Sequence, residues 1–323
     1  MKKLISWLLP ISYSLLVTIP SVSADNRYTP KSDQHIVPIP ETLNLDTDKV
    51  KLGKRLFNDP KLSADGTVSC ANCHNLDNFG TDSLPQSIGI NGQKGAFNSP
   101  TVFNSGLLFR QFWNGRVETL EEQVNDPITN PIEMGNSWPN VISYINEEES
   151  YTNVFLAIYG QSANKDNIAN AIAEFERSLL TPNSPFDRYL KGDESAIDVQ
   201  TKQGYGSFKI LGCISCHQGV AVGGNMFEKL GVVIPYYEDK IASDADLGRY
   251  KLTGIEEQKY EFKVPSLRNV ARTAPYFHNG SIATLEEAVK IMAKHQLGRS
   301  LTEQEIKNIV KFLKSLNGEL NVK

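Results

Sequence analysis

The chain has 323 residues, enough for two domains of ordinary size, and its 33 basic and 37 acidic side chains give a formal net charge of −4. This acidic balance disfavours nucleic acid as a partner. Beyond the first 20 residues no apolar run approaches the length of a membrane span, so we expect no membrane span in the rest of the chain.

The first 24 residues have the pattern of a cleaved secretory signal. Met1-Lys2-Lys3 gives a positive start, an apolar run extends to about Pro20, and small residues end at Ala24. A retained anchor is the alternative, but the small residues at the exit favour cleavage. Removal of residues 1–24 leaves 31 basic and 37 acidic side chains, a charge of −6. We therefore expect a soluble protein exported to the periplasm.

The first half of the chain begins with an extended arm over residues 25–45, which has three prolines and no periodicity. His35 lies in this arm, and we interpret it as an exposed polar residue. A helix capped by Asp46 or Thr47 is predicted next, and the motif Cys70-Ala71-Asn72-Cys73-His74 follows it. Residues 75–101 lack regular structure, a length that is uncommon unless the loop is functional.

Two further helices are predicted before the middle of the chain. The first covers residues 141–159, and the second starts at an Asp166 cap and carries an apolar stripe of Ile168, Ile172, Phe175 and Leu179. The proline-containing run 181–185 ends the second helix. We place a domain boundary there, between an N-terminal domain of residues 25–181 and a C-terminal domain of residues 182–323.

The second half repeats the order of helix, motif and loop. A helix over residues 198–211 precedes Cys213-Ile214-Ser215-Cys216-His217, and a glycine-rich loop comes after it. Two later helices are predicted to start at capping boxes, Thr284 with Glu287 and Thr302 with Glu305. The repetition suggests two related modules.

The two C-x-x-C-H motifs use all four cysteines of the chain. In this pattern both thiols add to the vinyl groups of a haem, and the histidine becomes an iron ligand. A zinc site or two disulfides would also use four cysteines, but neither explains a histidine directly after each pair. We therefore predict two covalently bound haem c groups, one in each half.

Other side chains that can bind iron or transfer protons stay ambiguous from local sequence. Glu133 lies in a turn bounded by proline and glycine, where burial would raise its pKa and suit it to proton transfer, but a surface acid fits the same pattern. Met292 and Met226 are packing residues by default and haem ligands as the alternative. His278 and His295 fit core, surface or ligand positions equally.

Several segments, in order and spacing, resemble the bacterial di-haem cytochrome c peroxidase family, which is related to MauG. The similarity runs from about Leu52 to Gly298 and is carried by the following stretches: Leu52-Gly53-Lys54-Arg55-Leu56-Phe57, Phe112-Trp113-Asn114-Gly115-Arg116, Pro131-Ile132-Glu133-Met134, Gly223-Gly224-Asn225-Met226-Phe227, Ala274-Pro275-Tyr276-Phe277-His278-Asn279-Gly280 and Thr284-Leu285-Glu286-Glu287-Ala288-Val289. The resemblance implies a mainly α fold of two cytochrome c-like haem domains with long irregular loops and little β structure.

The resemblance also implies roles for individual residues. The haem on Cys70, Cys73 and His74 would be the low-potential centre that binds peroxide, with Glu133 as the acid and base above it. The haem on Cys213, Cys216 and His217 would be the high-potential centre, with Met292 as its second ligand. Trp113 would relay electrons between them. A calcium ion would bind Asn98 and the carbonyl groups of Thr273 and Pro275.

One position departs from the family pattern. Many members have Ser-Ile-Gly-His in the loop after the first motif, and that histidine caps the peroxide-binding iron until the other haem is reduced. Here Ser87-Ile88-Gly89 is followed by Ile90, which cannot bind iron. We predict that the enzyme needs less reductive activation or none. Lys94 is an alternative group for that coordination position.

The expected reaction is reduction of hydrogen peroxide to water, with electrons from a small cytochrome c or a copper protein, in a homodimer. One rival is a MauG-like di-haem enzyme that oxidises a partner protein. That branch has a tyrosine where Met292 stands, so a spectrum showing a methionine-ligated haem would favour a peroxidase. The other rival is a di-haem cytochrome that only transfers electrons.

Overall fold

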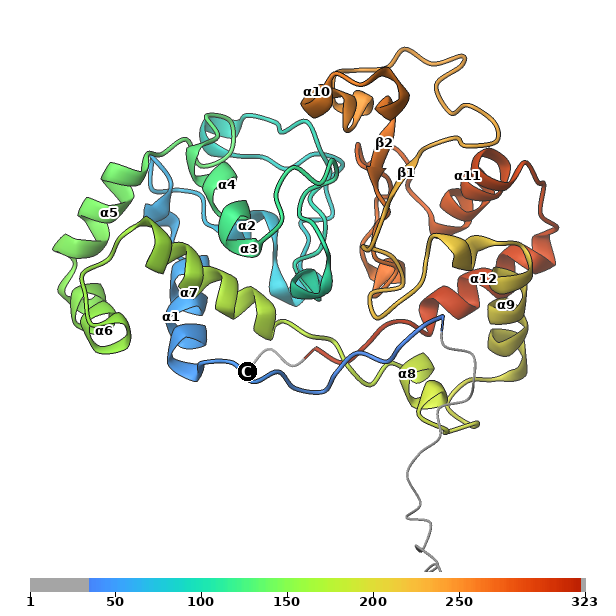
Figure 1. Ribbon diagram of the computed structural model, residues 1–323, viewed down its shortest axis with the longest axis horizontal. Coiled ribbons are helices and arrows are strands. Elements are labelled where there is room, and N and C mark those ends of the chain that lie inside the picture. The colour runs from blue at the N-terminus through green and yellow to red at the C-terminus, as the bar shows by residue number, and fades with distance from the viewer. Residues whose placement is uncertain (1–34, 321–323) are drawn as a thin grey trace, which may run out of the picture.

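A computed structural model describes residues 35–320, so the expected signal over residues 1–24 lies outside the described residues. The described chain is mostly helical (Figure 1), as predicted. Its one named sheet pairs β1 (Phe227–Lys229) with β2 (Glu261–Lys263) in antiparallel register, Phe227 opposite Lys263. In the described part of the chain no helix is long and apolar enough to cross a membrane.

The α-helices are short and are separated by long loops. In chain order they are α1 (Thr47–Phe57), α2 (Cys70–Cys73), α3 (Leu120–Gln123), α4 (Asn125–Thr129), α5 (Trp138–Glu147), α6 (Glu149–Tyr159), α7 (Lys165–Ser178), α8 (Pro185–Leu190), α9 (Val199–Ile210), α10 (Tyr250–Thr253), α11 (Leu285–Leu297) and α12 (Glu303–Lys314).

The core of the first half forms where α1 crosses α7. A Cβ at Gly53 would collide with the carbonyl oxygen of Ala171, so only glycine allows the two backbones to come this close. Beside the crossing, the rings of Phe57 and Phe175 meet edge to face with centroids 5.3 Å apart. Asp46 caps α1, as predicted, by accepting hydrogen bonds from the backbone N–H groups of Asp48 and Lys49.

The second half has the same crossing between α9 and α12. A Cβ at Gly204 would collide with the carbonyl oxygen of Asn308, and Phe208 packs on Phe312 with ring centroids 5.0 Å apart. Each half therefore has a glycine that lets a helix cross closely and a phenylalanine pair that fills the space beside it. This repetition supports two related modules built on one plan.

The two ends of the described chain cross between the halves. Ile36 is buried in the second core, and Leu320 packs against the first. The guanidinium of Arg268, fully buried with its partner Asp187, donates to the carbonyl oxygen of Val37 and fixes the arm. Figure 1 shows the N-terminal arm and the segment after α12 running side by side beneath the two halves.

The helix boundaries differ from the prediction at two places. The helix expected over residues 141–159 is split into α5 and α6, because Glu148 has an extended backbone between them. The cap of α7 is Asn164 and not Asp166, since the Asn164 side chain accepts from two backbone N–H groups. The predicted caps at Thr284 and Thr302 are confirmed, and Asp198 caps α9.

Candidate functional site

The first C-x-x-C-H motif forms one helical turn that ends at its histidine. Ser69 and Asn72 make a capping box that starts α2, so Cys70 and Cys73 lie at the two ends of one helical turn, on the same face. His74 ends the turn, and its Nδ1 lies 3.3 Å from the carbonyl oxygen of Gly80. This contact fixes the ring and leaves Nε2 pointing away from the backbone.

The second motif has the same arrangement on a 3₁₀ turn, Cys213–Ser215. The Nδ1 of His217 lies 3.4 Å from the carbonyl oxygen of Val222. The glycine-rich loop makes this possible: a Cβ at Gly223, whose φ is +125°, would collide with the carbonyl oxygen of Pro265 and crowd the His217 ring. Both imidazoles are thus held at Nδ1 by a backbone carbonyl group.

The chemical state of these residues fits covalent haem. Burial lowers the pKa of His74, and lowers that of His217 to about 4, so both rings are neutral and able to bind a metal. All four cysteines are free, and no group of three or more possible metal-binding side chains forms in the described part.

Glu133 is partly buried on the side of the first motif. Its Oε1 accepts a hydrogen bond of 2.8 Å from the Asn130 amide. Burial raises the pKa of Glu133, although the charge of Arg116 and the Asn130 hydrogen bond oppose the rise. Its charge also acts on Cys73, whose pKa rises to about 11 mainly through burial. The carboxyl group therefore lies close to the first attachment site and can hold a proton there.

Ile90 packs beneath the turn that carries Glu133. Its side chain is 7% exposed and belongs to the first core, and its N–H donates to the carbonyl oxygen of Glu133 over 2.8 Å. A Cβ at Gly89 would collide with the carbonyl oxygen of Ile132, which holds the two segments in close contact. Lys94, the alternative ligand, is exposed on the other strand of this small hairpin.

Trp113 lies on a loop of the first half that docks against the second half. The N–H of Phe109 donates to the carbonyl oxygen of Gly224, and Gly115 has no room for a side chain beside the Phe227 ring. The indole N–H of Trp113 donates to the carbonyl oxygen of Asn98 over 2.9 Å. The half-buried indole is therefore fixed where the two halves meet.

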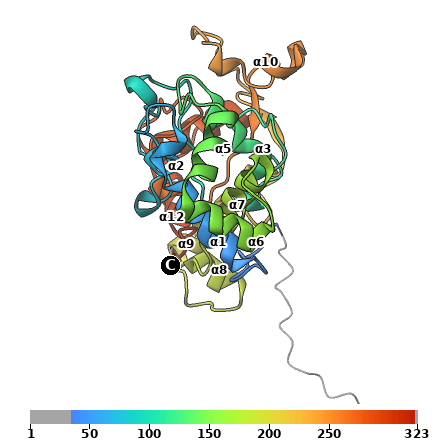
Figure 2. The same ribbon diagram turned by 90° about the vertical axis from the view of Figure 1, so that its left-hand side faces the viewer.

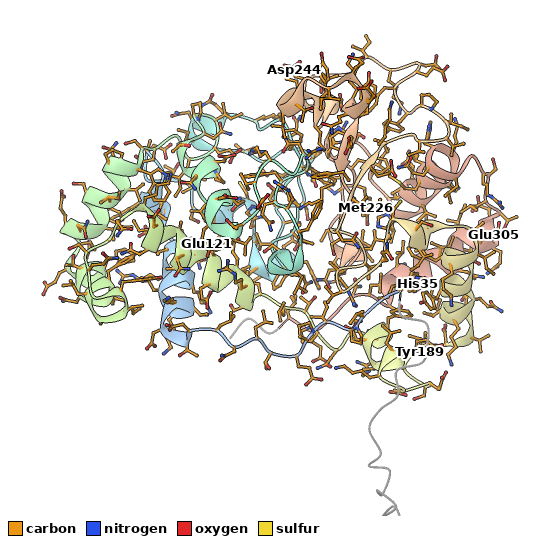
Figure 3. The ribbon with its side chains drawn as sticks, in the orientation of Figure 1. His35, Glu121, Tyr189, Met226, Asp244 and Glu305 are labelled. Atoms are coloured by element: carbon orange, nitrogen blue, oxygen red, sulfur yellow. The ribbon has the colours of Figure 1, made fainter. Side chains whose placement is uncertain are left out.

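Met292 lies on α11 and packs against a small core that also receives Trp113. One turn earlier on the same helix, Val289 packs against the second core together with Cys213. The helix therefore connects the second attachment site to the junction of the two halves. Met226, the alternative ligand, lies in the loop just before β1, near the middle of the view in Figure 3.

The three residues expected to bind calcium belong to two neighbouring loops. The N–H of Asn98 donates to the carbonyl oxygen of His278, which joins the Asn98 loop to the segment after Pro275. Asn98 is buried, and its amide donates to Leu84. In the described part of the chain neither the Asn98 side-chain oxygen nor the carbonyl oxygens of Thr273 and Pro275 accept a hydrogen bond. These free oxygen atoms fit a hard cation.

The remaining histidines have structural partners. His278 is 2% exposed, and its Nε2 lies 2.6 Å from a carboxylate oxygen of Asp246. The Nδ1 of His295 lies 2.9 Å from the carbonyl oxygen of Ile234. His35 is exposed, as predicted. These contacts assign His278 and His295 to packing.

Sequence reasoning missed the groups that surround Glu133. Asn130 shares its turn and binds its carboxyl group. Arg116 pairs with Asp126 and lies over the Phe112 ring, and its charge acts on Glu133. Local sequence does not indicate the approach of Arg116, because it joins a loop to a turn that follows two short helices.

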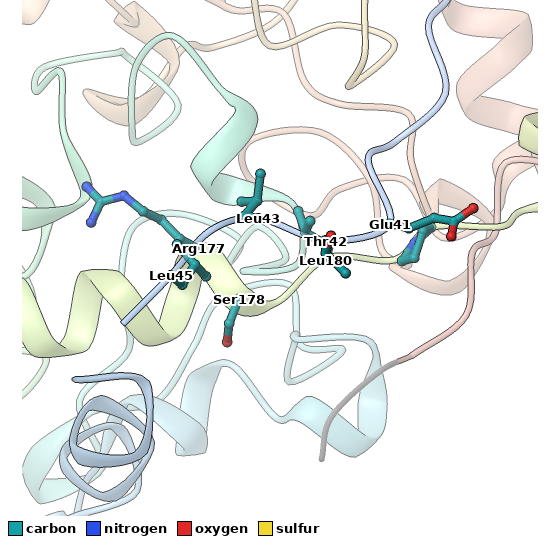
Figure 4. Close-up of a pocket in the computed structure, with 8 residues that line it drawn as sticks. Glu41, Thr42, Leu43, Leu45, Arg177, Ser178 and Leu180 are labelled. Atoms are coloured by element: carbon teal, nitrogen blue, oxygen red, sulfur yellow. The ribbon is translucent and has the colours of Figure 1, made fainter. Parts of the chain in front are cut away.

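A surface hollow of about 190 Å³ lies away from both motifs. It runs between residues 41–45 of the arm and the end of α7, with Glu41 and Arg177 near its two ends (Figure 4). None of the predicted site residues lines this hollow. The candidate site is therefore the region around the two motifs, where a bound haem would fill the space.

Known proteins resemble this chain over most of its length. A family model described as di-haem cytochrome c peroxidase matches residues 47–195. The cytochrome c551 peroxidase of Nitrosomonas europaea is 43% identical over 289 residues, covering 89% of this chain and 85% of the relative. The chain belongs to the di-haem cytochrome c peroxidase family. The cytochrome c peroxidase Ccp of Escherichia coli is 46% identical over 297 residues, which are 91% of this chain but 64% of that protein.

A solved structure of a MauG-like protein associated with microbial copper homeostasis has a TM-score of 0.77 and 28% identity, and the match covers 92% of this chain and 96% of the other. The fold of this di-haem cytochrome c peroxidase family member therefore extends to the MauG-like branch.

Proposed function

We propose that the protein is a periplasmic di-haem peroxidase that reduces hydrogen peroxide to two molecules of water. Two protons and two electrons are consumed, and the electrons come from a small cytochrome c or a copper protein. The observation that carries this proposal is the asymmetry between two similar attachment sites: a partly buried carboxyl group, Glu133, accompanies the first, whereas the helix of Met292 runs beside the second.

Each motif would hold one haem c through two thioether bonds and one histidine Nε2. When bound, the haem supplies an iron that exchanges single electrons and has a position at which peroxide binds. His74 and His217 are neutral and held by backbone carbonyl groups, as iron ligands require. Met292 would be the second ligand in the C-terminal half, where a thioether raises the reduction potential.

Glu133 would move a proton between the two oxygen atoms of peroxide. As a general base it would accept the proton of the inner oxygen, and as a general acid it would deliver that proton to the outer oxygen, which leaves as water. Burial, which raises its pKa, brings its proton affinity closer to what both steps need. Asn130 would hold the carboxyl group in place throughout.

Trp113 would carry electrons from the C-terminal to the N-terminal site. Its indole lies at the junction of the halves, and its hydrogen bond to Asn98 fixes the ring. A calcium ion on Asn98, Thr273 and Pro275 would stiffen this same junction, because Asn98 contacts both Trp113 and the loop after Pro275.

The expected homodimer is also part of the proposal. Ile241, Leu252 and Ile255 are exposed on a segment that carries α10 and projects from the body of the molecule (Figure 2). A second copy could cover this apolar surface.

We further propose that the peroxide site needs no reductive activation. Ile90 occupies the usual position of the capping histidine and is packed in the core, and Lys94 on the same hairpin is exposed. Mixing the fully oxidised protein with peroxide in a stopped-flow spectrophotometer should give an immediate change in the haem spectrum. No reaction until one electron is added would refute this point.

A matched variant sharpens that experiment. Ile90→His should make the fully oxidised protein slower to react, and one added electron should restore the rate if the new histidine binds iron. Steady-state assays with reduced cytochrome c test the function itself. Absence of peroxide-dependent oxidation, both before and after half-reduction, would leave only electron transfer.

A further inference from the structure

A buried polar cluster lies behind Trp113, on the side of the second half. Its centre is Asp246, which is 5% exposed. One carboxylate oxygen accepts from the Tyr237 hydroxyl over 2.8 Å and lies 2.6 Å from Nε2 of His278, and the other accepts from the N–H and hydroxyl of Ser243. The peroxidase mechanism above uses none of these groups.

Aromatic rings connect this cluster to Trp113 on one side and to the surface on the other. The Trp113 and His278 rings meet edge to face with centroids 6.3 Å apart. The His278 Nε2 lies 3.3 Å from the Tyr237 hydroxyl, and Tyr237 stacks on Tyr260 with centroids 4.5 Å apart. A continuous row of four rings therefore leads outward from the junction of the halves.

The row ends at a surface hollow of about 160 Å³. Tyr236, Tyr237 and Tyr260 form its aromatic lining, and Lys229 and Glu238 supply charged groups at its edge. A flat aromatic molecule could stack in such a hollow, while a hydroxyl group on it reaches a charged neighbour.

We propose that this row of rings carries oxidising equivalents from the peroxide site to the Tyr260 hollow, where the enzyme oxidises small phenols directly. The proposal rests on the peroxidase function proposed above. It adds a second reductant class, a small aromatic molecule with an ionisable hydroxyl group, to the protein donor. The overall reaction is one hydrogen peroxide and two phenols giving two waters and two phenoxyl radicals.

Asp246 makes the Tyr237 step possible. Reduction of peroxide withdraws electrons from the protein, and Trp113 loses one of them. Tyr237 then transfers an electron to Trp113 across the His278 ring. A phenol that loses an electron becomes a strong acid, and the Tyr237 proton passes to the carboxylate that already accepts its hydrogen bond. Tyr260 then returns one electron to Tyr237, which recovers its proton from Asp246.

The last step takes place at the surface. Tyr260 releases its own proton to solvent when it is oxidised, and it recovers an electron and a proton from the bound phenol. Tyr236 is a less suitable terminus because Nζ of Lys240 lies 3.4 Å above its ring, and a nearby positive charge disfavours electron loss. Tyr260, stacked on Tyr237 and lining the hollow, is the expected exit.

Three variants of the haem-loaded protein test the row: Tyr237→Phe, Tyr260→Phe and, as a matched control on the projecting segment, Tyr250→Phe. Each is mixed with hydrogen peroxide without a protein donor, frozen within milliseconds and examined by electron paramagnetic resonance. We expect a tyrosyl radical in the parent and in Tyr250→Phe, its loss in Tyr237→Phe, and a changed line shape in Tyr260→Phe.

A kinetic assay follows the same variants with guaiacol as the phenol probe and with reduced cytochrome c as the protein donor. Tyr237→Phe and Tyr260→Phe should lower guaiacol oxidation at least tenfold and leave cytochrome c oxidation unchanged. A parent that oxidises cytochrome c but forms no tyrosyl radical, or variants with full guaiacol activity, would overturn the inference. A parent that consumes no peroxide with either donor would overturn the proposed function instead.

Discussion

The two halves share a scaffold but differ in the groups that face their attachment sites. In each half a glycine lets two helices cross, a phenylalanine pair fills the crossing, and a backbone carbonyl group holds the histidine of the motif. The differences lie elsewhere: a partly buried turn brings Glu133 near the first site, and α11, which packs beside the second site, carries Met292 at the small core that also receives Trp113. The scaffold attaches the cofactor, and the surrounding segments determine its chemistry.

A second difference lies within the scaffold itself. If the crossings are superimposed, Gly53 on Gly204 and Phe175 on Phe312, then Glu176 of α7 corresponds to Leu313 of α12. Both side chains are buried, 5% and 3% exposed. A carboxyl group therefore occupies a position in the first half where the second half has a hydrocarbon side chain.

The largest expected effect comes from removing the carboxyl group that only the first site has. Glu133→Gln keeps the size and the Asn130 contact but cannot transfer a proton. Turnover with reduced cytochrome c should fall ~10²- to 10⁴-fold, a rise of roughly 3 to 5 kcal/mol in the barrier, while both haems stay bound. Glu149→Gln, an exposed change on α6, is the control. Near-normal turnover in the first variant would remove Glu133 from the mechanism.

The second site is tested through the midpoint reduction potential of its haem. Met292→His should lower the higher of the two midpoint potentials by on the order of 100 mV, because an imidazole stabilises oxidised iron more than a thioether does. Met226→Leu should leave both midpoints unchanged. A redox titration followed optically distinguishes these results. A shift in the Met226 variant alone would transfer the ligand role to the loop before β1.

The residues that attach the two haems could be predicted from the sequence at both sites. The C-x-x-C-H motifs are local, so Cys70 to His74 and Cys213 to His217 could be assigned from spacing alone. Helix caps such as Asp46 and Thr302 are equally local, and the structure confirms them. The sequence therefore predicts well the residues that attach each haem and the caps of nearby helices.

Contacts between distant segments could not be predicted in this way. The action of Arg116 on Glu133 depends on how a loop meets a turn, and the Asp246 cluster joins residues of two loops. The break at Glu148 depends on one backbone conformation that the apolar pattern does not reveal. Even the assignment of Glu133 as the candidate acid came from family resemblance, not from its neighbours.

The shared scaffold predicts matched costs in the two halves. Gly53→Ala and Gly204→Ala each place a methyl group against a backbone carbonyl oxygen of the crossing helix, so each should destabilise the protein by ~1 to 3 kcal/mol. Gly206→Ala, also in α9 but with open space around it, should be neutral or stabilising by up to ~1 kcal/mol. Denaturant unfolding of the haem-loaded protein measures all three. A harmless Gly204→Ala would show that the crossings are not equivalent.

The smallest expected effect concerns Glu176. Burial raises the pKa of Glu176 from 4.5 to about 8, so the folded protein retains a proton that the unfolded chain loses near pH 4.5. Stability relative to Glu176→Gln should therefore fall as pH rises from 4.5 toward 8 and become constant above that range. Between about pH 6 and pH 8 we expect a loss of roughly 1 to 2 kcal/mol in the parent only. Parallel pH profiles of the parent and the variant would mean that Glu176 is ionised in the folded state. The first half would then have a buried negative charge, and not a neutral carboxyl group, where the second half has Leu313.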